Sequence, residues 1–332
     1  MSRIVVALGG NALIRRGEDG SATVQRRNIH EAARAVAELD RAGHELVLTH
    51  GNGPQVGFLA IEADAASDIV PPPPLDVLVA ETQGQIGYLL AEALAARFAL
   101  DGRDRPITAV LTECVVDADD PAFGAPSKPV GPMYDEATAR STAAARGWVV
   151  ARDGSGWRRV VPSPRPLSII EADSIRSLVD AGVIVIASGG GGIPVARGDD
   201  GTFVGIEAVV DKDLAAVVLA EAVDADALLL LTDVTAVHIG WGSPAALPIR
   251  QLSVAGALAG VANGTFAPGS MGPKVSAAAD FVRRTGRRAA IGALDDAADV
   301  LEGRAGTSIV GAIGLPRSSV AAQVAWAAHP AI

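Results

Sequence analysis

Short apolar runs alternate with longer amphipathic segments along most of the chain. Compact runs of Val, Ile, Leu and Ala predict buried strands at residues 3–8, 44–49, 183–187, 227–231, 288–293 and 307–313, and a further strand within residues 106–116. The pattern predicts helices at residues 24–42, 75–100, 171–181, 211–223, 253–261, 274–285 and 295–302. Apolar strands that alternate with helices are typical of a mainly parallel sheet covered on both faces. The sequence therefore predicts an α/β fold.

Glycine clusters follow three of the predicted strands, at residues 9–10, 51–53 and 189–192. Ligands of open α/β sheets bind outside the carboxyl ends of the strands, so the fold would bring these loops to one edge. Their backbone N–H groups can bind an anion there. No G-x-x-x-x-G-K-[ST] loop occurs. Residues 51–57 are similar to a loosened dinucleotide fingerprint, but the acidic residue expected about 20 positions further on is missing.

The composition changes at residues 117–166, which are rich in Pro, Gly and charge. We interpret this segment as an insertion with its own small hairpins, a protruding flap subdomain. We predict that residues 1–314 form one domain with two lobes, at about 1–200 and 201–314. The tail, residues 315–332, has no assigned role.

Charge and cysteine content exclude several classes of protein. The net charge of −10 argues against nucleic acid or an anionic membrane surface as a partner. The one cysteine, Cys114, lies in an apolar run and is expected in the core, so we expect no intrachain disulfide and a cytoplasmic location. We expect no signal peptide and no membrane span. The histidines lack metal-ligand spacing, and His50 is interpreted as structural or as a support of the site.

Lysine is unusually rare. Of the 28 basic residues only Lys128, Lys212 and Lys274 are Lys, and each lies in unusual local sequence. A single such Lys is usually a surface residue. Three ammonium groups at one centre, however, suit a transferring phosphoryl group, whose charge lies on its equatorial oxygens. Asp211 and Asp213 flank Lys212 at a helix start; we expect Asp213 to complement the helix dipole and Asp211 to hold one or two ammonium groups in place.

Two further features are candidates for nucleotide binding. Residues 266–274 form a loop rich in Pro and Gly that is predicted to open a helix at Pro273 and Lys274. This loop could border an adenine and bring Lys274 to the phosphates. Asp233 follows an apolar strand, where it could cap a helix or lie near a nucleotide, and the sequence favours neither role.

Eight segments together resemble carbamate kinases, which belong to the amino acid kinase superfamily. They include Thr-His-Gly-Asn-Gly-Pro-Gln-Val-Gly at residues 49–57 and Asp-Lys-Asp at residues 211–213. The others lie at residues 7–12, 82–87, 128–132, 156–164, 189–194 and 267–274. They occur in the same order as in that family and span residues 3 to about 314, so the resemblance covers nearly the whole chain.

The resemblance implies an open three-layer αβα sandwich, a homodimer, and Mg²⁺ bound with ATP or ADP. It also implies the reversible reaction of ATP with carbamate to give ADP and carbamoyl phosphate, with ATP formation in arginine breakdown as the expected direction. Carbamate brings an oxygen that is already ionised, so the chemistry needs alignment and charge neutralisation rather than a general base.

The resemblance also implies roles for individual residues. The catalytic set is Lys128, Asp211, Lys212 and Lys274, with Lys128 reaching in from the flap and Asp211 organising the other two lysines. The carbamate and phosphoryl group would be bound by Gly9, Gly10, Asn11, Gly51, Asn52, Gly53, Ser188, Gly189 and Gly190. The nucleotide would be bound by Asp233, Phe266, Ala267, Pro268, Gly269, Ser270 and Met271. No protein metal site is implied.

Three other functions compete with this interpretation. A sister kinase acting on another small acid is the nearest, and the flap with its Lys128 argues against it. A nucleotide-binding regulator without catalysis need not keep the three lysines. An NAD-dependent oxidoreductase is weakened by the missing acidic residue of the fingerprint.

Overall fold

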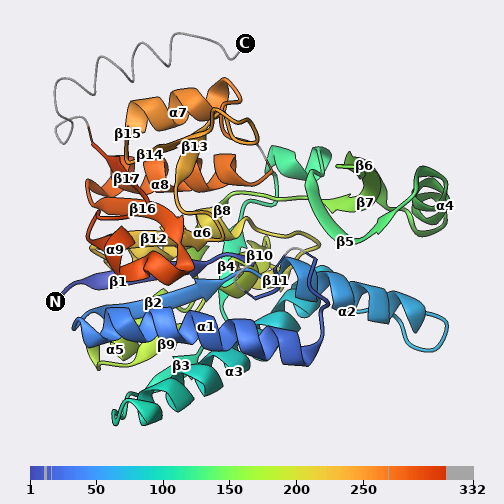
Figure 1. Cartoon of the computed structure of the whole chain (residues 1–332). Helices are drawn as coiled ribbons and strands as arrows, with labels where there is room; N and C mark the ends of the chain where they lie inside the picture. The colour runs from blue at the N-terminus through green and yellow to red at the C-terminus, as the bar shows by residue number, and fades with distance from the viewer. Residues whose placement is uncertain (11–12, 16, 268, 312–332) are drawn as a thin grey trace.

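The computed structural model of the chain describes residues 1–10, 13–15, 17–267 and 269–311 (Figure 1). Asn11, Pro268 and the tail at residues 315–332, for which the sequence raised hypotheses, lie outside the described residues.

A central sheet of eight strands organises the molecule, in the order β15-β17-β16-β12-β1-β2-β9-β3. All neighbouring strands are parallel except β16 and β17. The predicted mainly parallel sheet is therefore confirmed. In sheet order the strands are Gln251–Ser253, Thr307–Val310, Arg288–Ala293, Ala227–Thr232, Arg3–Leu8, Glu45–His50, Ile184–Ile186 and Ile107–Ala109.

Helices cover both faces of this sheet (Figure 1). The helices are α1 Ala22–Arg41, α2 Gly53–Ala65, α3 Leu75–Leu100, α4 Glu136–Arg146, α5 Ala172–Asp180, α6 Lys212–Ala222, α7 Val254–Ala262, α8 Met271–Thr285 and α9 Ala297–Leu301, with 3-10 turns η2 Pro121–Gly124, η3 Gly189–Gly191 and η4 Leu294–Asp296. Helices α5, α6 and α8 pack on one face, and α1, α3 and α9 on the other. Within the described residues, no helix is both long and apolar enough to cross a bilayer.

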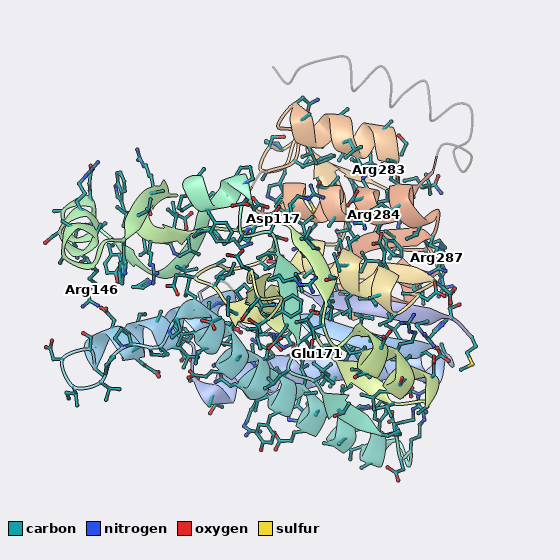
Figure 2. The ribbon with its side chains drawn as sticks, turned by 180° about the vertical axis from the view of Figure 1, so that it is seen from behind. Asp117, Arg146, Glu171, Arg283, Arg284 and Arg287 are labelled. Atoms are coloured by element: carbon teal, nitrogen blue, oxygen red, sulfur yellow. The ribbon has the colours of Figure 1, made fainter. Side chains whose placement is uncertain are left out.

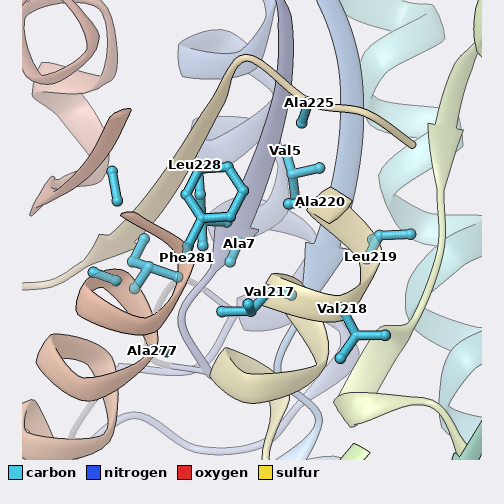
Figure 3. Close-up of a cluster of buried hydrophobic side chains, with 14 of the residues drawn as sticks. Val5, Ala7, Val217, Val218, Leu219, Ala220, Ala225, Leu228, Ala277 and Phe281 are labelled. Carbon is cyan, nitrogen blue, oxygen red and sulfur yellow. The ribbon is translucent and has the colours of Figure 1, made fainter. Parts of the chain in front are cut away.

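The two apolar layers follow from the alternation of side chains along each strand. In β1, Val5 and Ala7 join the cluster with α6 and α8, whereas Ile4, Val6 and Leu8 join the cluster with α1 and α3. Figure 3 shows the first of these clusters, in which Phe281 of α8 lies beside the strands and α6. Because both faces are covered, these strands are continuous apolar runs in the sequence.

Several boundaries differ from the prediction. Helix α1 begins at Ala22, two residues before the predicted start, and Ser21 caps it by accepting a hydrogen bond from the Val24 N–H. Helix α8 begins at Met271, two residues before the predicted Pro273. Such shifts of a few residues arise because capping depends on side-chain geometry that the apolar pattern does not encode.

The single strand predicted within residues 106–116 is two strands in two sheets. Strand β3 lies at the edge of the central sheet, whereas β4, Glu113–Val116, belongs to a four-stranded sheet with β11 Phe203–Gly205, β10 Ile193–Arg197 and β8 Pro166–Ile169. Between β3 and β4 the backbone of Thr112 is paired with a side chain. Its N–H donates to Oε1 of Gln83 at 2.9 Å, and its carbonyl accepts from Nε2 at 3.2 Å. The same carbonyl also accepts from the N–H of Ile193 in β10 at 2.8 Å, so Thr112 lies where the chain passes from one sheet to the other.

The segment at residues 117–165 leaves the body after β4 and returns at β8. It contains α4 and a three-stranded antiparallel sheet of β5 Lys128–Tyr134, β7 Gly156–Val161 and β6 Val149–Asp153, and it extends to one side of the body (Figure 1). We call residues 117–165 the flap. Its status as a subdomain, like the division of the rest into two lobes, stays a prediction.

The flap contacts the body at its base and at its outer end. Val130 and Val161 pack at the base in a small apolar cluster with Val56 of α2 and Val79 of α3. At the outer end Arg146 forms an ion pair with Asp64 of α2 (Figure 2). These contacts set the position from which Lys128, the first residue of β5, reaches the body.

Candidate functional site

The three glycine loops meet at one edge of the sheet. Strands β1 and β2 are adjacent and in register from Arg3 and Glu45 to Leu8 and His50, and β9 pairs with the other side of β2. The loops after them are so close that a Cβ on Gly51 would lie 2.9 Å from the backbone nitrogen of Gly10. The convergence predicted from the topology is thus present.

A cavity of about 880 Å³ opens at this edge. That volume is within the range of small-molecule sites. Its lining includes the following predicted site residues: Gly9, Gly10, Gly51, Asn52, Gly53, Lys128, Gly190, Asp211, Lys212, Asp233, Phe266, Ala267, Gly269, Ser270, Met271 and Lys274. A smaller cavity of about 290 Å³, lined by parts of β12, β16 and β17, contains none of them.

Two predicted phosphoryl-binding residues, Ser188 and Gly189, do not line the cavity. Both are buried, and Ser188 has no exposed surface. The N–H of Ser188 donates to Oγ1 of Thr112 at 3.0 Å, and its carbonyl accepts from Oγ1 of Thr49 at 2.8 Å. A Cβ on Gly189 would lie 2.3 Å from Nε2 of His50. These residues hold the third loop in place, and its Gly190 is the member that reaches the cavity.

The lysines form ion pairs with the two aspartates at the start of α6. Asp213 lies between Lys212 and Lys274, with Nζ to oxygen distances of 2.6 and 3.0 Å. Asp211 caps the helix by accepting from the N–H groups of Asp213 and Leu214, and its other oxygen lies 2.7 Å from Nζ of Lys128. Asp211 thus holds one ammonium group, as expected, but it is that of Lys128. The ion pairs of Lys212 and Lys274 are made with Asp213, which was expected only to complement the helix dipole.

Burial and charge shift the pKa values of these groups. Burial alone would raise the pKa of Asp213, but the two ammonium groups beside it hold that pKa well below its usual range. Burial lowers the pKa of Lys212, and the nearby charge of Lys274 adds to this effect. For Lys274 burial acts in the same direction, yet the attraction of Asp213 outweighs it and raises the pKa. Asp213 thus stabilises two cations at one buried point.

Two helix N-termini at the cavity have no side-chain cap. Asn52 and Ser270 are the N-cap residues of α2 and α8, and neither side chain bonds to its own helix. Both residues line the cavity. The positive end of each helix dipole favours an anion there, although the Gly272 N–H of α8 already donates to the carbonyl of Ala267 at 2.8 Å. At α6, by contrast, Asp211 already accepts from the first N–H groups of the helix. The positive charge at that helix start therefore comes from the ammonium groups.

The sequence did not point to two aromatic side chains of the cavity. His238 and Trp241 belong to the hairpin of β13 Val237–Ile239 and β14 Leu247–Ile249, and both line the cavity. Their ring centroids are 5.2 Å apart, and Trp241 is 63% exposed. Lone aromatic residues between short strands carry no sequence signal for this placement, which depends on where the hairpin folds.

Asp233 lies at the end of β12 and lines the same cavity. No helix starts at Asp233: a bend precedes β13 in this part of the described chain. The helix-cap hypothesis is therefore wrong. Asp233 accepts a hydrogen bond from the Thr232 hydroxyl at 3.1 Å.

Comparison with known proteins identifies the family. A model of the amino acid kinase family matches residues 2–293, and the chain belongs to this family. It is 48% identical to a carbamate kinase of Thermococcus kodakarensis over 93% of this chain and 99% of the relative. It is 49% identical to a carbamate kinase of Escherichia coli K12, with the same coverage. A solved carbamate kinase from Giardia lamblia bound to AMP-PNP matches with a TM-score of 0.87 and 41% identity, over 93% of this chain and 98% of that one. The resemblance found in the sequence is confirmed.

Cys114 and His50 are buried beside this site without contacting the cavity. Burial raises the pKa of the Cys114 thiol to about 12, which fits its predicted place in the core. Burial also lowers the pKa of His50 to about 4, the carbonyl of Gly51 opposes this change, and Lys212 adds to it. His50 is therefore neutral in the folded protein near pH 7.

We expect the free energy of unfolding to fall as the pH drops from about 6.5 to about 4. In this window the unfolded chain binds a proton at His50 and the folded chain does not, so the loss is at most roughly 3 kcal/mol. Denaturant unfolding across this window measures the loss, and His50→Gln should show a smaller one. Equal pH dependence in both proteins would contradict the assignment.

Proposed function

We propose that the chain catalyses the reversible transfer of a phosphoryl group between ATP and carbamate, which gives ADP and carbamoyl phosphate. The observation that carries this proposal is the set of three ammonium groups at one edge of the cavity, between the glycine loops and the loop at residues 266–271. The family and the carbamate kinase relatives support the same reaction.

The mechanism needs positioning and charge neutralisation. The carbamate oxygen, already ionised, attacks the γ-phosphorus of ATP, and the bond between that phosphorus and the bridging oxygen of ADP breaks. Lys212 and Lys274 neutralise the charge on the transferring group, because Asp213 holds both ammonium groups at the cavity before substrates arrive. Lys128 acts from the flap side. No histidine lines the glycine-loop end in the described part of the chain, and none is needed to remove a proton.

The nucleotide occupies the other end of the cavity. Phe266, Ala267, Gly269, Ser270 and Met271 border it, and the uncapped start of α8 would receive phosphate oxygens. The exposed face of Trp241, beside His238, offers a stacking surface for the base.

Mg²⁺ fits this site as a companion of the nucleotide. Proteins commonly hold Mg²⁺ through one or two carboxylates and the phosphates of the substrate. The described residues contain no cluster of three His, Cys, Asp or Glu side chains suited to a metal, whereas Asp211, Asp213 and Asp233 line the cavity singly or as a pair. The oxygens of Asp213 pair with Lys212 and Lys274, and those of Asp211 pair with the start of α6 and with Lys128. Asp233 is the carboxylate that would hold the ion together with the phosphates. When bound, Mg²⁺ supplies further neutralisation of phosphate charge.

The proposal extends to the assembly, the location and the direction of the reaction. We propose a cytoplasmic homodimer that forms ATP in arginine breakdown. Apolar side chains exposed on α3 and around the four-stranded sheet support an interface between two copies; they are Tyr88, Leu111, Leu167, Ile170, Phe203 and Val204. The single buried cysteine, Cys114, suits a reducing compartment.

The first test is ATP formation by the purified protein from ADP, Mg²⁺ and carbamoyl phosphate. We expect ATP well above the rate without enzyme. A folded protein that binds ADP but forms no ATP would contradict the proposal, and the acceptor end would then be screened with other small acids.

Replacing the central lysine should separate folding from catalysis. Lys212→Arg is expected to fold with an unchanged melting temperature but to lose about a hundredfold or more in kcat, because the planar guanidinium cannot take the place of a compact ammonium beside Asp213 and Lys274. Arg283→Lys is a matched exchange on the exposed side of α8 (Figure 2) and should leave kcat unchanged. Near-normal turnover of Lys212→Arg would contradict the assigned role.

The flap lysine should matter for the reaction more than for nucleotide binding. Lys128 is 35% exposed at its side chain, and its partner Asp211 belongs to the catalytic end. Lys128→Ala is therefore expected to lower kcat strongly while the dissociation constant of ADP, measured by calorimetry, changes little. An equal loss in both quantities would place Lys128 at the nucleotide instead.

A further inference from the structure

Helix α3 carries polar side chains that are buried directly behind the glycine loops. Thr82 is fully buried and Gln83 is 4% exposed, although both lie inside a 26-residue helix, more than a turn from either end. They belong to the segment at residues 82–87 that resembles carbamate kinases, and the proposed mechanism and nucleotide site assign no role to its residues. Buried polar groups of this kind need hydrogen-bond partners, and their partners belong to the site.

Gln83 supports the third loop through Thr112. Its side-chain amide bonds both the N–H and the carbonyl of Thr112, and Oγ1 of Thr112 accepts from the N–H of Ser188. Ser188 has a positive φ of 52°, which is unfavourable for a residue other than Gly. This chain of hydrogen bonds holds that conformation, from which Gly190 reaches the cavity.

Thr82 supports the second loop through Asn52. Nδ2 of Asn52 donates to Oγ1 of Thr82 at 2.9 Å, and the Thr82 hydroxyl donates to the carbonyl of Val79 at 2.7 Å. Because the one hydroxyl hydrogen is used on Val79, Thr82 can only accept from Asn52. The nitrogen of the Asn52 amide must therefore face Thr82, so the orientation of the amide is fixed.

The other amide atom, Oδ1 of Asn52, is left for the cavity. Asn is a preferred N-cap residue, yet Asn52 does not use its side chain to cap α2. A Cβ on Gly190 would lie 2.1 Å from Nδ2 of Asn52, so the amide packs directly on that glycine. Asn52 lines the cavity, and no described residue donates a hydrogen bond to its Oδ1. An acceptor oxygen thus stands among groups that otherwise favour anions.

We propose that Thr82 is a positioning residue that turns Oδ1 of Asn52 toward the acceptor, where it accepts an N–H of the carbamate amino group. This inference rests on the proposed function and explains why the site would prefer carbamate to other small oxyanions. The N–H groups and lysines of the site bind any small oxyanion, whereas a fixed acceptor favours one that carries an N–H. A methyl or an oxygen without hydrogen at that position would leave Oδ1 unpaired, which is how a polar site rejects a close analogue.

The experiment compares two phosphoryl donors to ADP. Carbamoyl phosphate carries an amino group, and acetyl phosphate carries a methyl group in its place. Wild-type protein should show a much higher kcat/KM for carbamoyl phosphate. In Thr82→Val the amide of Asn52 loses its fixed partner, so this preference should fall by about five- to tenfold, with kcat/KM for acetyl phosphate and the KM for ADP nearly unchanged.

Control variants distinguish positioning from a loss of structure. Thr82→Ser keeps the hydroxyl and should restore the preference, and Thr82→Ala, a second variant without the hydroxyl, should reproduce Thr82→Val. Thr285→Val removes a hydroxyl that bonds to Phe281 at the far end of α8, roughly 20 Å along the helix from Met271, and should leave the preference unchanged.

The outcomes separate the role of Thr82 from the proposed function. An equal loss for both donors in Thr82→Val and Thr82→Ala, or an unchanged preference, would overturn the role of Thr82. A wild-type protein that uses neither donor would overturn the proposed function itself, and the inference with it.

Discussion

Two buried ammonium groups that share one carboxylate are the constraint on which the rest of the site depends. Lys212 and Lys274 repel each other and lose hydration on burial, so their closeness requires Asp213 between them. A buried charge cluster of this kind contributes little net stability. It is held by apolar packing elsewhere, since α6 and α8, which carry the two lysines at their first turns, bury apolar residues against the same face of the sheet.

A second layer behind the loops carries out the same task by hydrogen bonds. Glycine loops bind anions well because no side chain covers their N–H groups, but the same lack of side chains leaves them without contacts of their own. The polar residues of α3 supply those contacts from behind. The lysines of the cavity are thus positioned by helices α6 and α8. The second and third glycine loops are positioned by side chains of α3.

The fold and the centre of the site could be predicted from the sequence because each left a one-dimensional signal. Buried parallel strands are continuous apolar runs, and the rarity of Lys along the chain singles out Lys128, Lys212 and Lys274. The roles of Asp211 and Asp213 could not be predicted in this way. Both are acidic residues at a helix start, and only the geometry of the cap decides that Asp211 bonds to the helix and to Lys128, whereas Asp213 pairs with the other two lysines. The burial of Ser188 and the position of Trp241 at the cavity likewise depend on contacts between segments that are distant in the sequence.

The way the flap is attached has a consequence for how this protein family can vary. Strands β4 and β8 pair with each other, Cys114 opposite Ile169, so the flap leaves and re-enters the body at neighbouring points. An insertion between paired strands can change in length or sequence while the body keeps its sheet and its core. Lys128 lies on that insertion, whereas Lys212 and Lys274 belong to helices of the body. The part of the cavity lining that the flap supplies, Lys128 included, is therefore separable from the body, and a graft of this segment from a relative could exchange it as one piece.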